Sequence, residues 1–113
     1  MINLKLFLVI LISCLIASCA VPYAKKGSGS FKGGYEDKKL GSGHFSIQVE
    51  GNGYTSFEVI EGYFHRRANE LCDGKQYSHS IERTTTQHKN YYAVSQYTLH
   101  NFPVVIGEIK CDI

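Results

Sequence analysis

An almost unbroken apolar run near the start of the chain limits how much of the sequence can fold as a domain. Residues 6–17 carry no charge and follow a single lysine, Lys5. A run of this length is typical of the hydrophobic region of a signal peptide. It is short for a membrane-spanning helix, which needs about 20 apolar residues. We therefore expect residues 1–18 to be a signal peptide and the fold to come from the rest of the chain.

The end of this run resembles a lipobox, the site at which bacterial prolipoproteins are lipidated on a cysteine and cut before it. The sequence LIASC ends at Cys19, and the resemblance implies that Cys19 is the lipid attachment site. Ala20 follows, which in enteric-type bacteria implies sorting to the outer membrane. The alternatives are a lipobox ending at Cys14, ordinary cleavage after Ala20, and an uncleaved anchor.

The segment that follows is rich in glycine and serine and has little to bury. We therefore expect residues 19–34 to be the lipidated cysteine and a flexible tether, and residues 35–113 to be one small domain. Residues 20–43 contain five lysines and two acidic residues, whereas residues 44–113 contain six basic and eight acidic residues. A mildly acidic domain argues against nucleic acid as a partner.

Two of the four cysteines remain for the domain. Cys14 leaves with the signal peptide and Cys19 takes lipid, so Cys72 and Cys111 are a single pair in an oxidising compartment. We expect a disulfide between them. A metal site is disfavoured because the chain has no C-x-x-C motif and no histidine within four residues of either cysteine.

Hydrophobic patterning predicts strands at residues 35–40 and 44–50 and then a helix. Residues 44–50 alternate between apolar and polar side chains. Thr55 and Glu58 form a T-x-x-E capping box at a helix start, and Asp73-Gly74 ends the helix near Cys72. An apolar stripe at helical spacing joins Ile60, Tyr63, Phe64, Ala68, Leu71 and Cys72.

The C-terminal part is rich in β-forming residues. We expect strands at residues 76–86, 91–100 and 104–113, with turns at residues 88–90 and 101–103. The predicted fold is therefore α+β. Two strands, one helix and three more strands form a mostly antiparallel sheet of four to five strands with one helix packed on it, closed by the disulfide.

Three short motifs resemble a family of small uncharacterised proteobacterial lipoproteins. They are GGY at residues 33–35, GNGYTS at residues 51–56 and RANEL at residues 67–71. The chain departs from the family pattern at Asn69, where the family has alanine, and at Cys72. The resemblance implies a lipoprotein domain of unknown role and supplies no catalytic residues.

Tyrosines are the residues most compatible with a binding surface. Four of them lie on the predicted C-terminal strands, and exposed tyrosines on a sheet commonly contact proteins or glycans. Cross-strand pairing that only stabilises the sheet is the alternative. The candidate contact residues are Tyr77, Tyr91, Tyr92 and Tyr97.

Histidines offer one further hypothesis. His79, His88 and His100 lie on or between the predicted C-terminal strands, where aligned neighbours would make a weak transition-metal site. Unclustered surface histidines are the simpler interpretation, and we expect neither a metal nor a cofactor. The sequence has no nucleophile motif, P-loop or dinucleotide fingerprint.

These features favour a non-enzymatic, membrane-anchored module in the bacterial outer membrane, facing the periplasm. Its expected partners are the lipid bilayer, through acylated Cys19, and an envelope protein. The alternative is an envelope stress or redox sensor that switches through the Cys72–Cys111 disulfide. A small hydrolase or metal-binding protein is a third hypothesis, and it requires a concave site in a very small domain.

Overall fold

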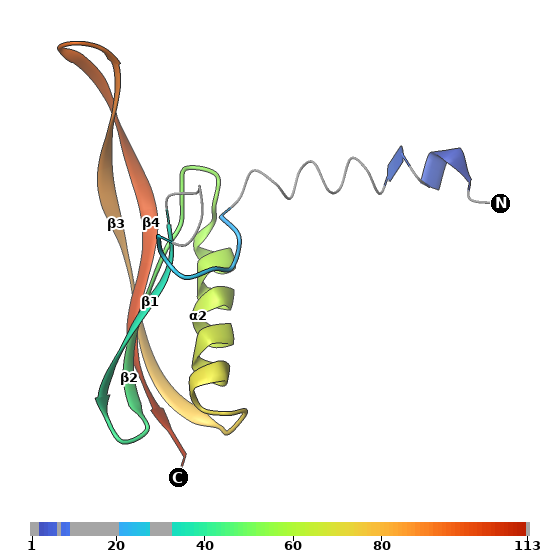
Figure 1. The fold of residues 1–113 in the computed structure, drawn as a ribbon, viewed down its shortest axis with the longest axis vertical. Coiled ribbons are helices and arrows are strands. Elements are labelled where there is room, and N and C mark those ends of the chain that lie inside the picture. The colour runs from blue at the N-terminus through green and yellow to red at the C-terminus, as the bar shows by residue number, and fades with distance from the viewer. Residues whose placement is uncertain (1–2, 7, 10–20, 28–32, 113) are drawn as a thin grey trace.

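One helix packs on one face of an antiparallel sheet in the computed structural model, which describes residues 3–6, 8–9, 21–27 and 33–112 (Figure 1). Within these residues the sheet has four strands, in the order β1-β2-β4-β3. The helix α2 lies between β2 and β3 along the chain. The elements are β1 (Gly34–Gly41), β2 (His44–Glu50), α2 (Phe57–Leu71), β3 (Tyr77–Ala93) and β4 (Gln96–Cys111). The α+β class, the antiparallel sheet and the single packed helix agree with the prediction.

The C-terminal part of the fold differs from the prediction. The expected turns at residues 88–90 and 101–103 do not occur, and two long strands replace three short ones. β3 and β4 pair without a break from Tyr77↔Cys111 to Tyr91↔Tyr97, so residues 88–90 pair with residues 98–100. An irregularity at Tyr92 precedes the last pair, Ala93↔Gln96. The order is therefore two strands, a helix and two strands, without the fifth strand.

Pro103 lies inside β4 because its missing N–H falls where the neighbouring strand has ended. The last pair between β2 and β4 is Glu50↔Val104. The Pro103 carbonyl accepts a hydrogen bond from the Gly51 N–H at 2.9 Å. The nitrogen of a strand residue points to the same side as its carbonyl, so Pro103 removes no bond from the pairing with β3.

The core lies between α2 and the sheet. Ile60, Phe64 and Ala68 of the helix are fully buried, as the helical stripe predicted. They pack with Ile47, Val49, Val105 and Ile109 of the two central strands.

A glycine in β4 permits this close packing. A Cβ atom at Gly107 would lie 2.2 Å from the Ser80 carbonyl oxygen and 2.9 Å from Cζ of Phe64. The Phe64 ring therefore lies in space that any larger residue at position 107 would fill.

Both ends of the helix are capped, though not by the residues expected. Ser56, rather than Thr55, is the N-cap, and its Oγ accepts from the Val59 N–H at 3.3 Å. The predicted reciprocal capping box is therefore absent. Asp73 has φ of 52° and donates to Glu70 O, while Gly74 donates to Asn69 O. This is a Schellman motif in which Asp73 occupies the left-handed position where glycine is usual.

The expected disulfide is present. It joins Cys72, at the end of α2, to Cys111, at the end of β4, across 39 residues of chain. Cys72 is only 4% exposed and belongs to the buried core. The bond therefore fixes the end of the helix to the sheet.

Residues 21–27 lie against the domain instead of forming a free tether. Val21 is 1% exposed, its N–H donates to Thr55 Oγ1 at 3.2 Å, and its carbonyl accepts from the Tyr63 hydroxyl at 2.8 Å. The expectation that this stretch has little to bury was therefore wrong for Val21.

Tyr23 adds a second contact between this segment and the domain. Its ring stacks on Tyr35 at 5.0 Å, and the Arg66 guanidinium lies 4.0 Å from its ring centroid. Burial and the hydrogen bond that its hydroxyl donates to Glu70 raise the pKa of Tyr23 well above its ordinary value. The backbone of the segment also bonds to the outer edge of β1 at Tyr35.

Candidate functional site

Beyond the end of β2, strands β3 and β4 continue as a two-stranded ribbon that projects from the domain (Figure 1). Every residue from 89 to 101 is exposed. Residues 94–95 form the turn. We call residues 89–99 the ribbon tip. Because the ribbon tip contributes no side chain to the core, core packing does not determine which residues occur there.

Aromatic and apolar side chains cover the ribbon tip. Val94 is fully exposed, Tyr92 is 68% exposed and Leu99 is 51% exposed. The rings of Tyr91 and Tyr97 form a cross-strand pair with centroids 5.4 Å apart. This pairing orders the two rings and leaves their outer surfaces exposed.

Lys89 is the only charged residue between Arg83 and Glu108. Its Nζ lies 4.6 Å from the ring centroid of Tyr97. The ribbon tip therefore offers apolar area, phenol hydroxyls and one positive charge, with no carboxylate.

Glu50 holds the base of the ribbon. This carboxylate is 4% exposed and lies 2.9 Å from Lys26 Nζ, 2.8 Å from His88 Nε2 and 3.0 Å from Thr86 Oγ1. Burial alone would raise the pKa of Glu50, but hydrogen bonds from Lys26, His88 and Thr86 hold it below its ordinary value. The imidazole of His88 also stacks on Phe102 at 4.3 Å. One charged group thus ties the N-terminal segment, β2 and the ribbon together.

The four candidate tyrosines do not form one surface. Tyr91, Tyr92 and Tyr97 lie on the ribbon tip. Tyr77 lies at the opposite end of β3, where its half-buried hydroxyl is 2.6 Å from His65 Nδ1. Burial raises the pKa of Tyr77.

The histidines are split between the two ends of the sheet. His88 and His100 are register partners, whereas His79 lies beside His65, with ring centroids 4.8 Å apart. The hypothesised trio of His79, His88 and His100 is therefore not assembled. Among the described residues, no group of three or more metal-binding side chains is suited to hold an ion.

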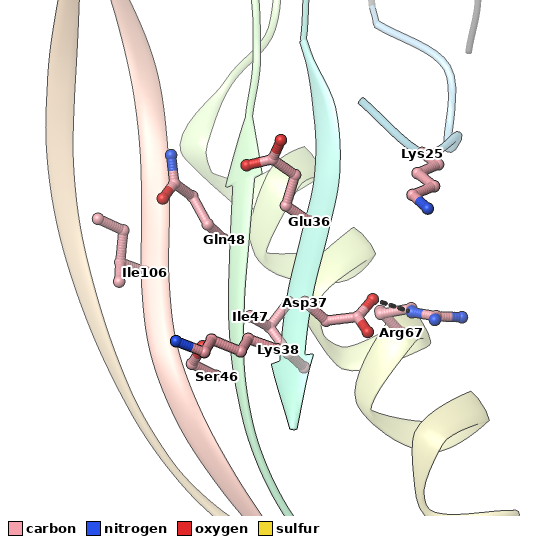
Figure 2. Close-up of a pocket in the computed structure, with 9 residues that line it drawn as sticks. All are labelled: Lys25, Glu36, Asp37, Lys38, Ser46, Ile47, Gln48, Arg67 and Ile106. Atoms are coloured by element: carbon pink, nitrogen blue, oxygen red, sulfur yellow. Dashed lines mark hydrogen bonds and ion pairs between the residues drawn. The ribbon is translucent and has the colours of Figure 1, made fainter. Parts of the chain in front are cut away.

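A shallow pocket of about 450 Å³ lies around β1 (Figure 2). Its lining carries both signs of charge, and Arg67 Nε donates to Asp37 Oδ2 at 2.7 Å. Arg67 also reaches Glu70 at 3.4 Å. The Arg67–Asp37 ion pair joins α2 to β1, so these two charges stabilise the packing of the helix on the sheet.

Sequence reasoning missed two residues of this end of the molecule. Glu50 lies on the face of its strand opposite Val49, as the alternation predicts, but its burial was not foreseen; Val21 falls within the predicted tether and is also buried. An apolar residue inside a glycine-rich segment is the one signal that pointed to Val21.

Comparison with protein-family models, with curated proteins and with solved structures gave no match. The resemblance to small proteobacterial lipoproteins therefore stays a prediction. The predicted signal peptide and Cys19 lie outside the described residues. No helix in the described part of the chain is long and apolar enough to cross a membrane.

Proposed function

We propose that this protein is a lipoprotein anchored through Cys19 and that its domain is a non-enzymatic interaction module. The exposed ribbon tip is the observation that carries the proposal, because it places an ordered aromatic surface away from the core. Its location is the outer membrane, facing the periplasm, as Ala20 implies. In the mixed-charge pocket around β1, Arg67 and Asp37 pair with each other and join α2 to β1.

The disulfide supports this role as a structural element. Cys72 is buried in the core, and the bond fixes α2 to β4 at the end of the molecule opposite the ribbon tip. The alternative function, an envelope stress or redox sensor, requires this bond to be reduced in its compartment. A reduction potential within reach of that compartment would favour the sensor.

Intact mass of the protein purified from its host membrane tests the anchor. We expect a chain that begins at triacylated Cys19, with two thiols that react only after reduction. An unlipidated chain that begins at Val21 would overturn the anchor. Thiols that react without reductant would overturn the disulfide.

A photo-crosslinking amino acid at Tyr92 tests the contact surface. We expect crosslinks to a lipid or a protein of the envelope from Tyr92. We expect none from Leu40, an exposed apolar residue on β1. Equal crosslinking from both positions would contradict the assignment of the ribbon tip.

A further inference from the structure

We infer that the ribbon tip rests on the lipid bilayer, so that the domain contacts the membrane at a second place besides its anchor. This inference deepens the proposed function and rests on the lipidation of Cys19. The ribbon tip contacts the interfacial layer of the membrane, where headgroups meet acyl chains.

The chemistry of the tip fits this layer. Tyrosine is enriched at membrane interfaces because its ring is apolar and its hydroxyl is polar. The tip carries three tyrosines with Val94 and Leu99, which supply apolar area, and Lys89, which suits the anionic surface of a bacterial membrane. A carboxylate would oppose such contact, and residues 84–107 contain none.

A second exposed aromatic residue lies in the loop that borders the base of the ribbon. Tyr54, in the loop before α2, is 79% exposed. The next residue, Thr55, binds the N–H of Val21. Residues 51–57 carry no charge. This loop therefore adds an uncharged surface beside the point where the chain enters the domain.

The position of Val21 brings the bilayer close to this loop. Only Ala20 separates Val21 from Cys19, and two residues of extended chain span at most about 7 Å. Because Val21 is buried, the domain has no slack with which to move away from an anchored Cys19. The loop and the base of the ribbon must then lie near the headgroups.

The ribbon is long enough that its direction matters. Thr86 is held at Glu50, and Ala93 follows seven residues later, which places the turn about 23 Å farther along the ribbon. A ribbon that pointed straight into the membrane from its base would cross most of the hydrocarbon core of about 30 Å. A ribbon whose tip contacts the interfacial layer therefore lies along the surface, with one face toward the lipid.

The register identifies that face. Tyr91 pairs with Tyr97 and Lys89 pairs with Leu99. By alternation these four side chains share the face that α2 covers lower in the sheet. Above the start of α2 the same face borders a hollow. Its lining mixes polar and apolar residues, with one carboxylate, Glu58, and comprises Asn52, Gly53, Thr55, Ser56, Phe57, Glu58, Thr85, Asn101 and Pro103.

The overall shape allows a flat surface to meet both places. The turn of the ribbon lies at one end of the molecule and the C-terminus at the other, whereas the start of α2 and residues 21–27 lie between them, so that such a surface is oblique to the long axis (Figure 1). The nearest carboxylates, Glu58 and Glu61, are paired with Arg83 at 3.8 Å and 2.6 Å. One arginine thus offsets one of these two charges, and one negative charge remains near the start of α2, outside the ribbon tip.

Quenching by lipid tests the contact directly. Val94→Cys carries an environment-sensitive fluorophore in the full lipoprotein, reconstituted in vesicles of phosphatidylethanolamine with phosphatidylglycerol as the minor lipid. Leu40→Cys, an exposed apolar position on β1 at the other end, is the matched control. With doxyl-labelled lipid we expect several-fold stronger quenching at Val94 than at Leu40.

Flotation of the same vesicles separates this inference from the proposed anchor. A protein that floats, with equal and weak quenching at both positions, would overturn the membrane contact and leave the anchor intact. A protein that does not float would overturn the anchor. The inference, which places the tip as a second contact beside that anchor, would then be overturned as well. If Tyr92 crosslinks to a protein and Val94 is not quenched, the tip binds a protein partner. This result would also overturn the membrane contact.

Discussion

Glu50 is a buried carboxylate at the meeting point of three segments. Its partners Lys26, His88 and Thr86 come from the N-terminal segment and from β3. A buried carboxylate is costly unless its oxygens are satisfied, and here a lysine, an imidazole and a hydroxyl satisfy them. This residue therefore links the position of the ribbon to the docking of the N-terminal segment.

Replacing the charge tests this link. We expect Glu50→Gln to lower the free energy of unfolding by about 1–2 kcal/mol at neutral pH, since the amide keeps the hydrogen bond from Thr86 and loses the ion pair with Lys26. The native pKa of Glu50 is lowered, so its stabilisation is present above the ordinary value of 4.5 and is lost as pH falls below it.

Urea unfolding from neutral to acidic pH checks this prediction. The difference between wild type and Glu50→Gln should shrink as pH falls. Glu82→Gln, an exposed glutamate on β3, is the control and should change little at any pH. A constant difference for Glu50→Gln would show that the charge is not its source.

We expect replacement by alanine to change the free energy of unfolding in opposite directions at two glycines. Gly107→Ala should destabilise the fold by about 3 kcal/mol, because the new Cβ meets the Ser80 carbonyl and the Phe64 ring. Gly62 lies in the exposed face of α2 with no neighbour within 4 Å, so Gly62→Ala should stabilise the fold by about 1 kcal/mol. Urea unfolding of both variants checks the pair, and effects of the same sign would contradict the packing described.

Among the elements, the ribbon is the one that folding does not explain. An isolated two-stranded hairpin is marginal in water, and this one depends on the body of the sheet at its base. The ribbon tip adds exposed apolar surface and buries none, so it does not stabilise the folded state. Its presence therefore points to a contact outside the domain.

Removing the ribbon tip tests this argument. We expect a variant without residues 89–99, with His88 and His100 joined by Asn-Gly, to unfold within about 0.5 kcal/mol of wild type. His88 and His100 are register partners, so the short turn closes the same pair. Circular dichroism and urea unfolding report the outcome. A loss of several kcal/mol would mean that the tip supports the core.

Elements with one buried face could be predicted from the sequence. β2 and α2 appear where expected because Ile47, Val49, Ile60 and Phe64 meet the core at the periods of a strand and a helix. The cysteine pair could be predicted because two partners allow only one intramolecular bond.

The ribbon could not be predicted as one hairpin. Both its faces are exposed, so no apolar alternation marks its continuity. Residues such as Asn90 and Pro103 suggest turns, whereas the real turn contains Val94, a β-branched residue. Tyr91, Tyr92 and Tyr97 could be predicted to lie on strands because tyrosine favours strands. Glu50 and Val21 were missed because their partners lie far away in the sequence.

At the scale of the whole molecule, the disulfide and the N-terminal segment hold opposite ends of one small core. The bond closes the end that carries the C-terminus, and Val21 and Glu50 fix the end that carries the ribbon. A domain this small buries a modest fraction of its surface, so such links contribute a large share of its stability.

Loss of the bond should therefore be severe. We expect the double variant Cys72→Ala, Cys111→Ala to lose about 4 kcal/mol, the chain-entropy value for closing a loop of 39 residues. Urea unfolding checks this, with reduced wild type as the parallel. A loss below about 1 kcal/mol would show that the packing of α2 alone holds that end.

The docking of Val21 also determines what an approaching molecule meets. A domain on a long linker tumbles and shows every side in turn. With Cys19 anchored and the ribbon tip on the bilayer, as we propose, two contacts fix the tilt of this domain, and each copy turns only about the membrane normal. The C-terminal end then faces the aqueous side permanently, so a fusion or epitope placed there stays accessible, whereas one placed in the turn at Val94 is hidden.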